Sequence, residues 1–211
     1  MNKDKIIDKI VHELYEDHFS PKESEFSVRL GNAVELFYEL ITIPINNEEL
    51  DGMATTLPTA IGNFYQSDTE HRLIYITTIA TAFDAIIKKV FFLTDPAKFT
   101  TAINSKWMLK KLVENCGILR TNDFSILWDV PNPINDTSGF PTYLQTTYKT
   151  RNKVHEAKDW TEHQLSTRYI ACLMTYVYLV LENYNALKSG IENFIKAEEH
   201  KKLMAGVDME K

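Results

Sequence analysis

The sequence predicts an all-α fold, a multi-helix bundle with four core helices plus shorter N-terminal and connecting helices. Apolar residues recur at three- and four-residue spacing along most of the chain, which is the period of an amphipathic helix. Several of these segments open with a capping pattern. The connections between most of them are short, which favours helices packed beside one another.

Length and charge limit the domain organisation and the partners. The chain has 211 residues and a net charge of −6. We expect one helical domain over residues 1–197 and a charged tail over 198–211, which either frays or links to further domains. A chain of this length buries about 70% of its unfolded surface without needing disulfides or metal. The negative charge argues against tight, sequence-independent binding to a nucleic-acid backbone, so any contact with RNA should be local or made together with a partner.

The cysteines and the apolar runs predict a cytoplasmic protein that is neither secreted nor embedded in a membrane. Cys116 and Cys172 lie far apart inside apolar helical patterns, which predicts buried, reduced thiols. The chain opens on an amphipathic pattern rather than on a signal segment. The longest apolar run, residues 169–181, is too short to span a bilayer.

The N-terminal half supplies two of the four expected core helices. After an amphipathic first helix that stops near His18, Ser20 and Pro21 predict the start of a helix, with the core portion over 24–43 ending before Pro44. Residues 44–66 are rich in Pro, Gly and Asn and leave room for one or two short helices.

Residues 68–93 carry the strongest helical pattern in the chain. Two neighbouring apolar stripes leave only a narrow polar strip, so this helix should be central, with Ile79 and Phe83 fully buried. Asp84 lies on the polar strip. We favour an ordinary surface pair between Asp84 and Lys88, four residues apart; the alternative is a cleft that faces a distant functional site.

The C-terminal half supplies the other two core helices, over 142–157 and 161–187. A helix restarted at Asp95-Pro96 and an irregular stretch over 118–141 precede them, and a long loop in a compact domain is often functional. Thr161 begins a capping box for the last long helix. That helix carries more apolar and aromatic surface than one stripe needs, which predicts a homodimer.

Arg151 and His155 form the constellation that could carry chemistry. On one continuous helix, Leu144, Tyr148, Arg151 and His155 would share a face that points into the bundle or into an interface. A buried guanidinium beside an imidazole requires partners or a ligand anion. Such a pair can cleave RNA without metal or any other cofactor, because histidine moves protons near neutral pH and arginine holds the phosphate. Asn152 could orient either group by hydrogen bonding.

This arrangement resembles the HEPN (higher eukaryotes and prokaryotes nucleotide-binding) domain. The resemblance rests on an Arg, a following polar residue and a His near the start of the last long helix of an α-helical bundle. Three residues separate Arg151 from His155, where the family has four to six. The resemblance implies metal-independent endoribonuclease activity in toxin–antitoxin, CRISPR or phage-defence systems, with the active site shared across a dimer. It implies catalytic roles for Arg151 and His155, and substrate binding by Asn152, with Tyr148 and Lys153 beside it.

Other interpretations of this segment stay open. Arg151 and His155 could form a solvated ion-pair network with Glu156, Asp159 or Glu162, or a degenerate site that binds RNA without cutting it. The sequence therefore leaves two functions. The first is an RNA-directed module, plausible in a phage-defence, toxin or stress system. The second is a non-catalytic helical adaptor that dimerises or docks to a larger protein partner or to further domains.

Overall fold

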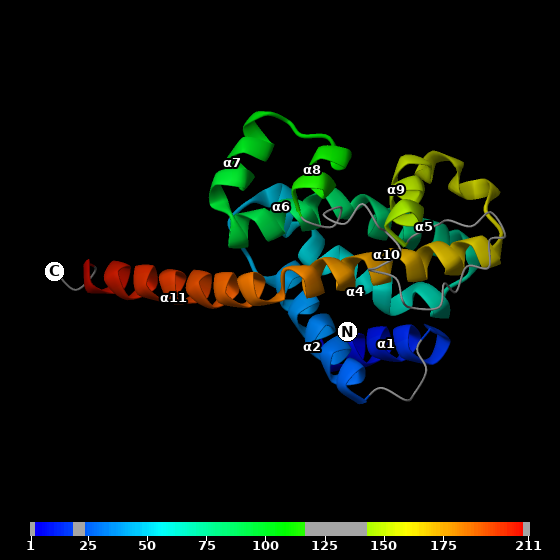
Figure 1. The fold of residues 1–211 in the computed structure, drawn as a ribbon, viewed down its shortest axis with the longest axis horizontal. Helices are drawn as coiled ribbons and strands as arrows, with labels where there is room; N and C mark the ends of the chain where they lie inside the picture. Colours follow the sequence, from blue (N-terminus) through cyan, green and yellow to red (C-terminus); the bar gives the residue numbers. More distant parts are fainter. Residues whose placement is uncertain (1–2, 19–23, 117–142, 209–211) are drawn as a thin grey trace.

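The computed structural model describes residues 3–18, 24–116 and 143–208, and every regular element in these ranges is a helix. The predicted helix start at residues 20–23 and the irregular stretch over 118–141 lie outside the described residues. Figure 1 shows the helices gathered around α10, with α11 extending away from the rest. In chain order the elements are α1 (Lys3–His18), α2 (Ser24–Thr42), α3 (Glu48–Asp51), α4 (Met53–Asn63), η1 (Phe64–Gln66), α5 (Thr69–Thr81), α6 (Phe83–Thr94), α7 (Pro96–Asn104), α8 (Leu109–Asn115), α9 (Tyr143–Asn152), η3 (Val154–Asp159), α10 (Glu162–Glu182) and α11 (Tyr184–Asp208).

Helix α10 is the centre of the bundle. All residues from 169 to 177 are buried, because α1, α2, α5 and α9 pack around this helix. Its start is the predicted capping box, in which the Thr161 and Gln164 side chains each bond the other's backbone N–H. The extra apolar surface that suggested a homodimer is thus covered within a single chain, and the homodimer stays a prediction.

The predicted single helix over 68–93 is divided into α5 and α6 at Ala82. Ile79 and Phe83 are fully buried, as predicted. The Tyr176 hydroxyl of α10 donates a hydrogen bond to the carbonyl of Ile79, one turn before the division. Thr81 also donates its hydroxyl to the carbonyl of Thr77 at 2.7 Å, a bond that bends helices. The hydrogen bond from Tyr176 and the bond from the Thr81 hydroxyl to its own helix therefore accompany a break in a segment whose apolar residues keep helical spacing throughout.

The predicted helix over 161–187 likewise ends early, at Glu182, and α11 then runs from Tyr184 to Asp208. The expectation of a charged tail over 198–211 that frays or links to further domains stays a prediction, although α11 extends to Asp208. Gly190 fixes where α11 packs, since a Cβ at this position would lie 2.1 Å from the carbonyl oxygen of Leu93 in α6. Only glycine permits two helix backbones to approach this closely.

The first helix is fastened to α10 by a buried carboxyl group. Tyr169 donates its hydroxyl to Glu13 Oε2 at 2.6 Å, and Lys9 lies 3.7 Å from Glu13 Oε1. The ammonium of Lys9 also donates to the carbonyl of Gly62 at 2.7 Å. Burial raises the pKa of Glu13 from 4.5 to about 7, although the hydrogen bond from Tyr169 and the charge of Lys9 act in the opposite direction.

A second buried charge, Lys89, ties α6 to the end of α2 and to α3. Its ammonium donates to the carbonyl of Ile41 at 3.3 Å and lies 3.7 Å from Asp51. Burial lowers the pKa of Lys89 from 10.5 to about 8. The side chain is completely buried, so its role is structural.

The two cysteines fit their predicted state, since Cys116 and Cys172 are both buried and neither forms a disulfide. Within the described ranges, no helix has the length and apolar content needed to cross a membrane.

Candidate functional site

Helix α9 packs on α10 through hydroxyl groups rather than through a wide apolar stripe. Thr146, Thr147 and Thr150 are buried beside Tyr143 and Leu144. Thr147 donates its hydroxyl to the carbonyl of Ala171 in α10 at 3.0 Å. Because the buried hydroxyls of Thr147 and Thr150 each have a hydrogen-bond partner, a helix with little apolar surface can pack here.

Helix α9 ends at Asn152, so Arg151 and His155 do not share one helix face. Lys153 leaves the helical conformation (φ −114°, ψ 17°), and the chain continues as the 3₁₀ helix η3. This turn directs Ala157 and Trp160 into the core. The prediction that Leu144, Tyr148, Arg151 and His155 point together into the bundle is therefore wrong, because burial of Ala157 and Trp160 prevails over continuation of the helix.

Arg151 is held at the surface by an acidic residue of another helix. Its Nη2 donates to Asp84 Oδ2 at 2.9 Å, while Nη1 donates to Asn152 Oδ1 at 3.3 Å. The side chains of Arg151 and Asp84 are 38% and 26% exposed. The preferred Asp84–Lys88 pair is not what the structure contains, since Lys88 pairs with Glu49 at 2.8 Å. The alternative, that Asp84 faces the distant constellation, describes the geometry better.

His155 lies beyond the end of α9 and points into solvent. Its side chain is 73% exposed, and Nε2 is 3.6 Å from Glu156 Oε1. Lys153 also pairs with Glu156, at 3.1 Å. We name the surface formed by Tyr148, Arg151, Asn152, Lys153 and His155 the α9–η3 corner. The α9–η3 corner matches the ion-pair interpretation in part. Glu156 is the partner of His155, as that interpretation expected, but Arg151 pairs with Asp84 instead of Glu156, Asp159 or Glu162.

Sequence reasoning missed a second guanidinium behind this corner. Arg168 of α10 donates from Nη1 to Thr150 Oγ1 at 3.1 Å, and its guanidinium carbon lies 4.2 Å from the Trp160 ring centroid. Burial lowers the pKa of Arg168, and the nearby charge of Glu156 opposes this. The available signal was a single arginine at the start of the long apolar run of α10, directly before the buried Tyr169.

The corner therefore combines an oriented guanidinium with a freely accessible imidazole. Arg151 can bind a phosphate through the N–H groups that Asp84 does not occupy, and His155 can exchange protons with a ligand. Across the described residues, no group of three or more His, Cys, Asp and Glu side chains is placed to hold a metal ion.

Comparison with known proteins adds no family to this description. The chain matches no protein-family model, no curated protein and no solved structure.

Proposed function

We propose that this chain is an RNA-directed module of the HEPN type, in which the α9–η3 corner binds single-stranded RNA and Arg151 and His155 cleave it without metal. The observation that carries the proposal is the 2.9 Å pair between Arg151 and Asp84, with the exposed His155 four residues further along the chain. An ion pair to a neighbouring helix orients the guanidinium while the Arg151 side chain stays 38% exposed, so it can receive an anion from solvent.

The local charge supports a contact with RNA despite the acidic chain. Residues 149–159 contain four Lys or Arg and two Asp or Glu, whereas the whole chain carries −6. An anionic ligand is therefore attracted to this segment and repelled by much of the remaining surface. Binding should weaken as salt increases, because phosphate contacts release counterions.

The chemistry assigned to the site is transesterification at a ribose. The 2′ oxygen attacks the adjacent phosphorus, the bond from phosphorus to the 5′ oxygen breaks, and a 2′,3′-cyclic phosphate and a 5′ hydroxyl result. His155 accepts the 2′ proton or donates a proton to the leaving 5′ oxygen. Arg151 stabilises the added negative charge on the phosphate oxygens. By the resemblance, the second histidine needed for both transfers comes from another copy of the chain.

The experiment is incubation of the purified protein with single-stranded RNA in excess EDTA. Wild-type protein should give cyclic-phosphate ends, and His155→Ala should lower the rate by about 10²–10⁴-fold. Arg151→Lys should also be damaging, because an ammonium lacks the two-pronged geometry of a guanidinium. His163→Ala is the matched control, since it removes another exposed histidine, in the first turn of α10. RNA that stays intact with wild-type protein would overturn the cleavage, and RNA that also stays unbound would overturn the RNA-directed function as a whole.

The second candidate is a non-catalytic adaptor that pairs or docks through its helices. A different observation favours it: the C-terminal half of α11 extends beyond the bundle and exposes Leu203 and Met204 (Figure 1). Intact RNA together with a stable protein complex would select this function. For either candidate we propose a cytoplasmic setting, and for the first a phage-defence, toxin or stress system.

A further inference from the structure

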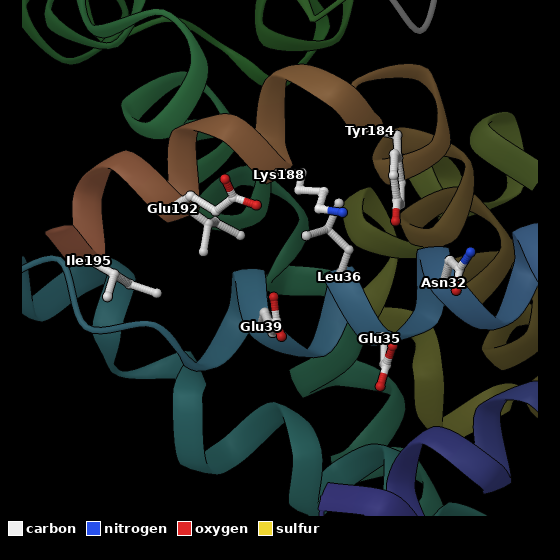
Figure 2. Close-up of a pocket in the computed structure, with 9 residues that line it drawn as sticks. Asn32, Glu35, Leu36, Glu39, Tyr184, Lys188, Glu192 and Ile195 are labelled. Atoms are coloured by element: carbon white, nitrogen blue, oxygen red, sulfur yellow. The ribbon is translucent and has the colours of Figure 1, made fainter.

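Helices α2 and α11 enclose a groove of about 500 Å³. Figure 2 shows Leu36 of α2 and Lys188 of α11 pointing toward one another, whereas Glu35 lies at the edge and points away from α11. Leu36 and Ile191 are buried at its base, and Ile195, 45% exposed, lies where the groove opens along α11. An apolar base with a half-exposed isoleucine at its mouth is suited to apolar side chains of a partner.

The rim of this groove is mainly acidic. Glu35 and Glu192 are exposed and have no ion pair with any described residue, whereas Glu39 lies 3.7 Å from Lys3. Lys188 is the single basic residue among those lining the groove. An occupant should therefore present an apolar side chain next to a basic one.

The projecting end of α11 presents this combination. Between residues 195 and 204 of α11 none is buried, and Leu203 is 70% exposed directly after Lys201 and Lys202. Lys201 already pairs with Glu198 at 2.6 Å. Lys202 and Leu203 follow Ile195 by seven and eight residues, which places them about 20° and about 80° to either side of Ile195 around the helix, on the same half of its surface. An exposed leucine on this part of α11, where no residue is buried, gains free energy when another surface covers it.

We propose that the occupant is a second copy of this chain, through an antiparallel pair of α11 helices in which each tip lies in the other's groove. The helix that projects is also the helix that forms one wall of the groove. A two-fold axis that crosses α11 between Ile195 and its C-terminal end therefore places the tip of each copy in the groove of the other. The offset from Ile195 to Leu203 is eight residues, or about 12 Å along a helix.

In this pair, Leu203 packs over Leu36 and Ile191 of the partner, and Lys202 faces the acidic rim formed by Glu35 and Glu192. Antiparallel helices also bring the positive end of one helix dipole near the negative end of the other. The contact involves a single helix and groove from each copy, so we expect micromolar association that weakens with salt.

This inference rests on the second candidate function and not on RNA cleavage. The α9–η3 corner lies at the opposite end of the molecule from the tip of α11 (Figure 1). Pairing through α11 thus leaves both corners exposed and far apart, so this dimer does not supply the second histidine that the proposed RNA cleavage takes from another copy. Assembly is measured without RNA, so its failure and the failure of the RNA-directed function are separate results.

The test is sedimentation equilibrium of the full chain from about 1 µM to about 1 mM at low ionic strength. Wild-type protein should pass from monomer to dimer. Leu203→Glu should raise the dissociation constant at least about tenfold, because it places a carboxylate in an acidic, apolar groove. Met204→Glu is the matched control: Met204 is 58% exposed, but it follows Ile195 by nine residues and so points to the opposite side of the helix, about 180° from Ile195, and its effect should be small.

A charge exchange makes the test specific to the groove. Lys202→Glu and Glu192→Lys should each weaken the dimer by roughly two- to fivefold, as expected for a rim pair, and the double variant should recover most of the loss. Circular dichroism should show unchanged helix content, since all these side chains are exposed. A monomer at every concentration overturns the proposal, as does a dimer that responds equally to Leu203→Glu and Met204→Glu.

Discussion

Replacing Glu13 by glutamine tests how α1 is held on the bundle. Burial raises the pKa of Glu13 from 4.5 to about 7, a difference that corresponds to about 3 kcal/mol. Because the folded-state pKa lies above the unfolded one, the contribution of this carboxyl to stability is fully present below about pH 4.5 and is lost as the pH rises through about 7. Glutamine keeps an oxygen that can accept the hydrogen bond from Tyr169 but does not titrate.

The assay is urea unfolding of wild type and Glu13→Gln at several pH values between about 4.5 and 8. The free energy of unfolding of the variant, relative to wild type, should increase by about 3 kcal/mol across this range. Glu182→Gln alters an exposed carboxyl at the end of α10 and should follow wild type at every pH. If the Glu13→Gln and wild-type curves run parallel, the Glu13 carboxyl is not destabilised by burial and the reasoning fails.

Two further predictions concern packing. Gly190→Ala should lower the free energy of unfolding by about 1–3 kcal/mol, because the new methyl group meets the Leu93 carbonyl at 2.1 Å. Gly31→Ala is the control: its methyl group meets nothing within 4 Å, so it should raise the free energy of unfolding by about 0.5–1 kcal/mol. Equal effects of the two variants in thermal unfolding would contradict the close approach of α11 and α6. Phe83→Ala should cost about 3–5 kcal/mol, since the ring is completely buried, and a loss below about 1 kcal/mol in urea unfolding would show that α6 is peripheral.

The positions of the main helices could be predicted from local sequence patterns, whereas the break between α5 and α6 could not. Helix α2 ends at Thr42, within a residue of the predicted end, and the capping box at Thr161 is present, because periodicity and capping act over a few neighbouring residues. The division at Ala82 involves a hydroxyl from Tyr176, a residue far along the chain. Such a bond depends on how α5 and α10 pack, and no window of sequence around residue 82 contains it.

The candidate site shows the same distinction. Helical spacing selected Arg151 and His155, but the partner that orients the guanidinium, Asp84, comes from α6. Arg168 reaches the corner from α10 by way of Thr150. Spacing along one helix predicts which residues are neighbours only while the helix continues, and α9 ends between the two residues that were expected to act together.

The central position of α10 has a consequence for how the chain folds during synthesis. α10 begins at residue 162, yet it is packed by three helices from the first half of the chain, α1, α2 and α5. α4, also from the first half, packs against those three helices. At about 5–20 residues per second, these early helices emerge from the ribosome several seconds before α10 does. In that interval their apolar faces have no central helix to cover them. The nascent chain should therefore bind holdase chaperones until α10 is synthesised, and its release should coincide with the appearance of Tyr169 and Tyr176.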